Sequence, residues 1–299
     1  MGIKGLFFTC LQAPRFSDCL PAKRKGQSIS NRESVCKNLE AFESFEEDSA
    51  MNAPPLKLLV DLSSYESFMQ NPWTHELTER YKLDAITAKQ AIEILIDDLK
   101  RLNSGYMDEK SRTLFTTLEG RVKGKGSFFK KLYERCKEHC RSQGFDKENL
   151  ESWYQGINDL AGVRFSCPYF DEVEIAIRDK IRPFLESRGY ATDLSSAGMK
   201  DKNYLDKGDE NGYRSFHFFL KVPTVIDIYG TTKGVICEVQ GRSELQHVWA
   251  VKSHDLLYKA EEGWLKPNAE TLKDMQELSN NLRSVDHFLC RIRHRVRGN

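Results

Sequence analysis

The sequence predicts an α+β domain in which a mixed β-sheet is flanked by helices. Three observations predict this class. Apolar side chains recur at helical spacing in residues 84–103, segments typical of strands lie within residues 161–242, and a long helical pattern covers residues 269–297. Residues 171–187, between the predicted strands at 163–167 and 216–222, also have a helical pattern.

Length and composition limit the organisation of the chain. Its 299 residues are 39% hydrophobic, which is enough for one domain of ordinary size and an appended region. Residues 1–55 are polar and have few periodic apolar positions, so we expect a disordered tail. We assign residues 56–267 to the folded domain with its N-terminal helices, and residues 268–299 to a C-terminal helix with a basic end.

Helices are predicted before and after the strand-rich segment of the sequence. The apolar face of helix 84–103 is formed by Ile92, Leu95, Ile96, Leu99 and Leu102. A second helix is expected over residues 127–143, where Gly144 ends it. Residues 244–258 are also expected to be helical. The apolar stripe of helix 269–297 could serve the core or an interface between copies of the chain.

Three strands are predicted, at residues 163–167, 216–222 and 235–240. The last strand contains an unexpected carboxylate, because Glu238 shares one face with Ile236 and Gln240. An edge strand with one wet face would explain it. The alternative is a carboxylate held on a rigid scaffold to bind a metal or accept a proton, and Arg242 and His247 just beyond favour this function.

Asp159 lies where a loop or helix end enters the first strand. A lone aspartate at such a point is most often a cap or turn residue. Two carboxylates at the ends of neighbouring strands, however, suit a magnesium-dependent phosphoryl enzyme, because Mg²⁺ binds few protein oxygens and completes its octahedron with water and phosphate. Asp159 and Glu238 are therefore candidate Mg²⁺ ligands.

Residues 120–131 form a basic segment that contains several glycines. The segment does not fit the phosphate-loop pattern, because Glu119 stands where the first glycine is required and Gly126 replaces the Ser or Thr. Its cations lie near the start of a helix and suit triphosphate oxygens: they are Arg121, Lys123, Lys125, Lys130 and Lys131. A solvated basic face is the alternative.

The block Asn211-Gly212-Tyr213-Arg214-Ser215-Phe216-His217 puts an aromatic residue and an arginine directly after a glycine turn and ahead of a strand. Its tyrosine and arginine offer flat surfaces for a nucleobase, and its histidine offers a donor. A hairpin turn alone would explain the Asn-Gly pair but not the residues after it.

In order along the chain, four blocks resemble the synthetase domain of the RelA/SpoT family. They are Arg121-Val122-Lys123 with Ser127 and Lys131, Asp159-x-x-Gly162-x-Arg164, Asn211-Gly212-Tyr213-Arg214-Ser215-x-His217, and Glu238-Val239-Gln240-x-Arg242. The resemblance covers about residues 85–265. Because the upstream region holds only His75 and His139, and no His-Asp signature of the hydrolase half, the chain is most similar to the small alarmone synthetases.

The resemblance implies a nucleotidyltransferase-like fold and transfer of the β,γ-pyrophosphate of ATP to the 3′-hydroxyl of GDP or GTP, which makes (p)ppGpp. It implies Mg²⁺ held by Asp159, with Glu238 sharing the metal or activating the hydroxyl. The implied ATP side comprises Arg121 and Arg164 around the adenine, Lys123 and Lys131 on the phosphates, and Ser127. The implied acceptor side comprises Tyr213 stacked on the base, with Asn211, Arg214, His217, Gln240 and Arg242.

Three departures from the family pattern leave the acceptor open. Asp209 stands where many members have a lysine, Gly241 replaces a usual aliphatic residue, and Ser253 replaces a frequent glutamate. The acceptor could instead be an adenine nucleotide or the 3′ end of tRNA, whose phosphates the basic residues 291–297 could bind, although they also suit a helix C-terminus. A catalytically inactive nucleotide sensor is a third alternative.

Charge balance and cysteine usage limit the partners and the cellular compartment that we expect. Lys and Arg (45) nearly balance Asp and Glu (44), so no global charge favours a polyanionic partner. The eight cysteines lack paired spacing and are expected to be free thiols in a reducing cytoplasm. No apolar stretch approaches the ~20 residues of a membrane span. We therefore expect a cytoplasmic protein. The resemblance implies synthesis without degradation and, as in many small family members, homo-oligomers formed through flanking helices.

Overall fold

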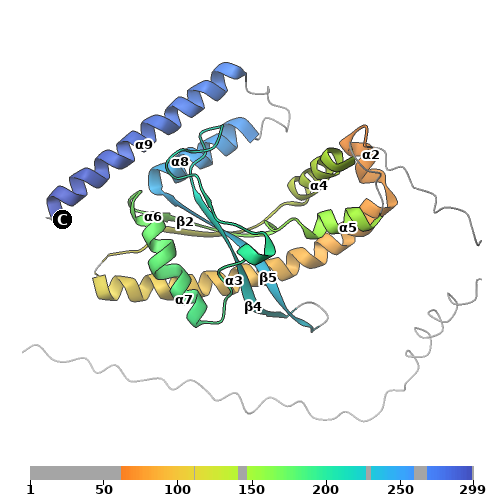
Figure 1. Ribbon diagram of the computed structural model, residues 1–299, viewed down its shortest axis with the longest axis horizontal. Coiled ribbons are helices and arrows are strands. Elements are labelled where there is room, and N and C mark those ends of the chain that lie inside the picture. The colour runs from red at the N-terminus through yellow and green to blue at the C-terminus, as the bar shows by residue number, and fades with distance from the viewer. Residues whose placement is uncertain (1–61, 111, 141–146, 227–229, 259–267, 298–299) are drawn as a thin grey trace, which may run out of the picture. The chain divides into compact units, whose positions relative to one another are not determined.

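The computed structural model describes residues 62–110, 112–140, 147–226, 230–258 and 268–297 (Figure 1). All of them lie in one compact unit, Lys57–Asn299. The expected tail and Gly144 lie outside the described residues, and the domain boundaries stay predictions.

The five strands form one mixed sheet in the order β1-β2-β5-β4-β3. Their bounds are β1 Thr117–Val122, β2 Ala161–Cys167, β3 Lys202–Asn203, β4 Phe216–Ile226 and β5 Thr232–Ser243. The pair β2 and β5 is parallel, and the other neighbours are antiparallel. The mixed sheet confirms the predicted fold class. The three predicted strands are present and longer than expected, whereas β1 and β3 were not predicted.

Helices surround the sheet. Their bounds are α2 Tyr65–Gln70, α3 Pro72–Lys110, α4 Lys125–Cys140, α5 Lys147–Gln155, α6 Glu172–Ile175, α7 Arg182–Ser187, α8 Glu244–Ser253 and α9 Ala269–Arg297, with the π-helical turns η1 Ala176–Ile181 and η3 His254–Tyr258 and the 3₁₀ turn η2 Ser195–Ala197. The predicted helix 84–103 is the middle of α3, which is much longer. The pattern over 171–187 is confirmed as α6, η1 and α7 in sequence.

The main core lies between α3 and one face of the sheet, and α3 contacts β1, β2, β4 and β5 (Figure 1). The buried side chains of α3 include Ala88, Ile92, Leu95 and Leu99, and those of the sheet include Val163, Phe218, Cys237 and Val239. Burial of each large side chain stabilises the fold by roughly 1.5–3 kcal/mol. A second cluster joins α2, α4 and α5 to the first part of α3.

Packing on this core face explains why position 241 is a glycine. It pairs with Phe165 of β2, and a Cβ at position 241 would lie 2.5 Å from Cζ of Phe165 and 3.1 Å from Cδ1 of Ile177. Phe165 is almost fully buried. The departure at Gly241 therefore makes room for an aromatic ring in the core rather than changing the opposite face.

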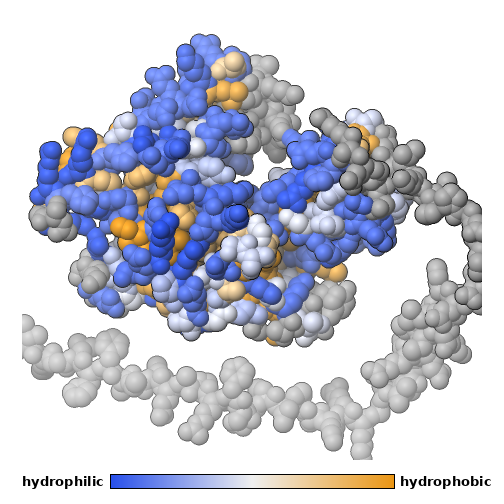
Figure 2. All heavy atoms as spheres, in the orientation of Figure 1, coloured by the Kyte–Doolittle hydropathy of each residue, from blue (hydrophilic) through white to orange (hydrophobic). Residues whose placement is uncertain are grey.

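The C-terminal helix α9 packs beside α8 through a narrow strip. Its buried residues are Met275, Ser279, Asp286 and Cys290. Most of the predicted apolar stripe is exposed, including Val285 (46%), Leu289 (40%) and Val296 (80%). In Figure 2, hydrophobic residues gather on the side of the molecule where Figure 1 places α6 and the C-terminal half of α9. The stripe thus contributes little to the core, and the homo-oligomer stays a prediction.

Candidate active site

The sheet face opposite the core carries polar side chains, and residues of three strands lie there at one level. Strand register places Arg121 of β1 opposite Gly162 of β2, and Gly162 opposite Glu238 of β5. Because side chains alternate along a strand, Arg121 and Glu238 share this face. Gly162 has no side chain, so the surface between them stays open.

Asp159 precedes β2 and is held by two lysines. Its Oδ2 accepts hydrogen bonds from Nζ of Lys123 at 3.0 Å and from Nζ of Lys131 at 2.9 Å. Burial by itself would raise the pKa of Asp159, but the hydrogen bonds and charges of Lys131 and Lys123 lower that pKa below its usual value. The carboxylate is therefore ionised at neutral pH.

Glu238 is held by neighbours on the same face of the sheet. Nδ1 of His217 lies 3.1 Å from its Oε1, and Nε2 of Gln240 donates to its Oε2 at 2.8 Å. Burial would raise the pKa of Glu238, but His217 and Gln240 lower it overall. The negative charge of Asp159 acts against this shift, which indicates that the two carboxylates are close.

Tyr213 and Gln240 join the remaining polar groups. The Tyr213 hydroxyl lies 2.9 Å from Nε2 of His217 and accepts a hydrogen bond from Nη2 of Arg242 at 2.9 Å. Oε1 of Gln240 accepts from Nε of Arg164 at 3.1 Å and from Nη2 of Arg242 at 3.0 Å. A continuous polar chain thus runs from Glu238 through His217 and Tyr213 to Arg242.

A cavity of about 330 Å³ opens beside the two carboxylates. Its charged lining residues are Asp159, Glu238, Lys131, Arg135, Lys200 and Lys202. The sequence analysis did not select Arg135, Lys200 or Lys202. A signal existed for Arg135, which follows Lys131 by four residues on α4 and so lies on the same helix face. The other two lie in or next to β3, which was not predicted.

Other predicted site residues lie at different depths. Arg121 is exposed as a residue, but its guanidinium lies partly buried against the protein. This burial and the charge of Arg164 lower the pKa of Arg121, so the two guanidiniums are neighbours. Ser127 is exposed near the start of α4, and Asn211 is exposed in the turn before Tyr213. These three residues thus reach solvent, and none of them lines the cavity beside Asp159 and Glu238.

Arg214 is not brought into this group. It is only 5% exposed, and it donates to Oγ of Ser279 at 3.1 Å and to Oδ1 of Asn280 at 2.8 Å, both on α9. Adjacent residues in an extended segment point in opposite directions. When Tyr213 faces His217, Arg214 therefore faces α9, and its position fits anchoring of the loop better than contact with an acceptor.

The donor set fits Mg²⁺ better than a metal enclosed by protein ligands. Within the described ranges, no group of three or more His, Cys, Asp and Glu residues could hold a metal. Mg²⁺ usually takes one or two carboxylates and fills its other positions with water and phosphate oxygens. Oδ1 of Asp159 is buried and has no hydrogen-bond partner among the described residues, so it is available to such an ion.

Comparison with protein-family models gives one match over these residues. Residues 120–263 match the region found in RelA/SpoT proteins. This region is therefore similar to the RelA/SpoT family. The match begins just before Arg121 and includes Asp159, Tyr213, Glu238 and Arg242, so these site residues lie inside the matched region.

Two curated relatives of the chain are named as GTP pyrophosphokinases. GTP pyrophosphokinase YjbM of Bacillus subtilis (strain 168) is 27% identical over 171 residues, which is 57% of this chain and 70% of YjbM. GTP pyrophosphokinase YwaC of the same organism is 27% identical over 126 residues, which is 42% of this chain and about half (54%) of YwaC.

Solved structures show the same fold. Small alarmone synthetase 1 from B. subtilis, bound to its product pppGpp, superposes with a TM-score of 0.55 at 24% identity and covers 73% of this chain and 98% of that chain. The same enzyme bound to AMPCPP has a TM-score of 0.50 at 21% identity, covering 74% of this chain and 100% of that chain. The RelA/SpoT region of this chain therefore lies in a small alarmone synthetase fold.

Proposed function

We propose that this protein is a pyrophosphokinase that transfers the β,γ-pyrophosphate of ATP to the 3′-hydroxyl of GDP or GTP, making (p)ppGpp. The observation that carries this proposal is the pairing of Asp159 and Glu238 beside one cavity, with Lys131 and Lys202 also lining it. Phosphoryl transfer needs mainly alignment and neutralisation of charge, which two carboxylates with several cations can supply. The names of YjbM and YwaC support the same reaction.

On the ATP side, Lys123 and Lys131 hold the phosphates, and Arg121 and Arg164 lie on either side of the adenine. Both lysines now bind Asp159, so they are already placed next to the carboxylate that would hold Mg²⁺ together with Glu238. When bound there, Mg²⁺ neutralises phosphate charge and orients the transferred group. The positive charges of the two lysines are then shared between Asp159 and the phosphates.

On the acceptor side, Glu238 accepts the proton of the attacking 3′-hydroxyl. Its carboxylate is ionised, and His217 at 3.1 Å fixes Oε1 and can share the proton. Tyr213 supplies a flat surface for the acceptor base, with the Arg242 guanidinium 5.3 Å from its ring centroid. The cations Lys200 and Lys202 are placed to neutralise phosphates in the cavity.

One observation weakens the tRNA alternative. Of the basic residues at the end of α9, Arg293 and His294 lie within ion-pair distance of Asp171, and Arg297 lies 4.0 Å from Glu172. These side chains gather at one pocket beside Asp171 and Glu172 rather than forming an extended stripe along α9 for RNA phosphates.

The test is a comparison of acceptors. Purified protein with ATP and Mg²⁺ is given GDP, GTP, AMP, ADP, further ATP or deacylated tRNA, and AMP release and the pyrophosphorylated product are measured. We expect product with GDP or GTP that disappears in Asp159→Asn. Product only with adenine nucleotides or tRNA would replace the proposed acceptor. Nucleotide binding without AMP release would indicate an inactive sensor.

A further inference from the structure

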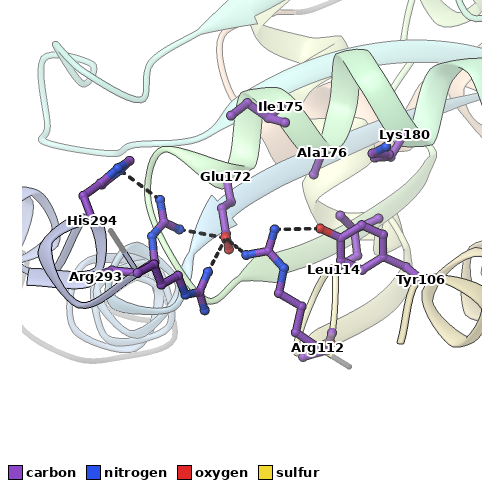
Figure 3. Close-up of a pocket in the computed structure, with 11 residues that line it drawn as sticks. Tyr106, Arg112, Leu114, Glu172, Ile175, Ala176, Lys180, Arg293 and His294 are labelled. Carbon is purple, nitrogen blue, oxygen red and sulfur yellow. Dashed lines mark hydrogen bonds and ion pairs between the residues drawn. The ribbon is translucent and has the colours of Figure 1, made fainter. Parts of the chain in front are cut away.

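We propose that the pocket where α6, η1 and α9 meet the segment after α3 binds a phosphate-type oxyanion, at a site separate from the candidate active site (Figure 3). Its lining shares no residue with the cavity beside Asp159 and Glu238. The pocket lining contains four cationic side chains and one carboxylate: Arg112, Lys180, Arg293 and Arg297 with Glu172.

Three guanidiniums converge on one oxygen of Glu172, as Figure 3 shows. Nη1 of Arg293 lies 2.7 Å from Oε1, Nη1 of Arg112 lies 3.0 Å from it, and Nη1 of Arg297 lies 4.0 Å from it. Each guanidinium carries five N–H donors, so a single carboxylate oxygen cannot satisfy three of them. The pocket therefore has donors and positive charge in excess of its acceptors.

Arg293 supplies the second observation. Its side chain is only 10% exposed, and Nη2 pairs with Asp171 at 2.6 Å. Nη1 is buried and makes no hydrogen bond within the part of the chain that the structure describes, although Glu172 is near. The 2.7 Å contact with Oε1 of Glu172 thus pairs the charge of Nη1 without a hydrogen bond to its N–H groups, and a phosphate oxygen is an acceptor that guanidinium geometry fits well.

Charge accounting favours an anion even when the neighbouring carboxylate is included. Asp171 pairs with Arg293 and His294 at the edge of the pocket. Lys180 is exposed, and it has no ion pair with the described carboxylates. The four cations thus exceed the two carboxylates, and Lys180 can turn toward a ligand without giving up a partner.

The size of the pocket limits the ligand. The pocket measures about 160 Å³, whereas sites that enclose larger organic ligands measure roughly 300 Å³ or more. One or two phosphoryl groups fit this space. The ligand is therefore orthophosphate, pyrophosphate or the terminal phosphates of a larger molecule whose remainder stays outside.

The test is calorimetric titration of the full chain with pyrophosphate, with the candidate active site saturated by a non-hydrolysable ATP analogue. We expect one equivalent to bind. Lys180→Gln and Arg112→Gln should each weaken binding about tenfold or more, the usual effect of losing a charged partner. Arg178→Gln is the matched control, because Arg178 is an exposed cation on the same turn η1 but pairs with Glu174 outside this pocket.

A second variant changes binding in the opposite direction. Glu172→Gln removes the carboxylate that competes for the guanidiniums, so pyrophosphate should bind more tightly, an effect that a purely structural ion network would not produce. Circular dichroism checks that each variant is folded. Equal binding of ADP would identify a phosphate tail as an accepted ligand, and binding of pyrophosphate alone would identify the free ion. No binding to the saturated parent, or equal binding by Lys180→Gln and Arg178→Gln, would overturn the proposal.

Discussion

Glu238 combines ionisation with fixed geometry, and replacing it by Gln separates the two. Both of its oxygens have neighbours, His217 and Gln240. Glu238→Gln keeps the shape but removes the proton acceptor, so turnover should fall on the order of 10²-fold or more. Single-turnover kinetics with ATP and GDP measures this loss. Near-normal turnover would remove Glu238 from the mechanism.

The pH dependence of turnover follows from the same residue. The pKa of Glu238 is lowered by His217 and Gln240 despite its burial. Its carboxylate therefore stays ionised throughout the neutral range and is protonated only as pH falls below the usual glutamate range. Protonation of Glu238 should therefore not lower the turnover rate of the parent between pH 8 and pH 6.

Tyr213 is predicted to act through both its ring and its hydroxyl. Tyr213→Ala should weaken acceptor binding by roughly 1–3 kcal/mol, the scale for losing a stacking aromatic, while ATP binding stays close to normal. Tyr213→Phe keeps the ring but deprives Arg242, which is 2% exposed, of a hydrogen-bond acceptor. We therefore expect Tyr213→Phe to lose acceptor affinity measurably as well. Calorimetry with GDP and with ADP checks both variants, and unchanged acceptor affinity in Tyr213→Ala would contradict the stacking role.

At the scale of elements, Asp286 joins α9 to the start of α8. Its Oδ2 accepts a hydrogen bond from Oγ of Ser243 at 2.5 Å, and Ser243 is the N-cap of α8 in a capping box with Gln246. Burial raises the pKa of Asp286 to about 6, although the bond from Ser243 acts against that rise. A carboxyl group thus sits where its ionised form is disfavoured.

Asp286→Asn should therefore change how stability depends on pH. A raised carboxyl pKa means that the folded state binds the proton more tightly than the unfolded state does, so this group lowers stability as pH rises from about 4 to about 6. Above that window, Asp286→Asn should be more stable than the parent by on the order of 1–3 kcal/mol, and near pH 4 the difference should vanish. Urea unfolding at both pH values measures it, with exposed Asp274→Asn as the control. A variant less stable than the parent at pH 8 would contradict the assignment.

Over the whole molecule, the helices with strong periodicity and the strands β2, β4 and β5 could be predicted from sequence. The strand β1 could not, because Glu119, Gly120 and Arg121 are poor strand formers that become a strand by pairing with β2. The first part of α3 was missed for a related reason: Leu77 and Tyr81 face the cluster of α2, α4 and α5 rather than the sheet. Tertiary contacts decided both elements.

The candidate site follows the same rule. Motifs selected Asp159 and Glu238, but only register shows that Arg121, Gly162 and Glu238 lie at one level. The direction of Arg214 depends on the helix α9, more than 60 residues away in sequence, and no local pattern could predict it. Lys202 was missed because the strand that contains it, β3, was not predicted.

The last prediction concerns the extent of the folded unit. Removal of residues 1–50 should leave the protein folded and able to catalyse, because that segment lacks the apolar periodicity of the core. A longer deletion, of residues 1–70, provides the contrast: it removes α2 and Phe68, which is fully buried against Tyr133, and loss of a buried phenylalanine costs roughly 3–5 kcal/mol. Thermal unfolding and AMP release should match the parent for the shorter deletion and decline for the longer one. An insoluble or inactive product of the shorter deletion would place part of the catalytic unit before residue 51.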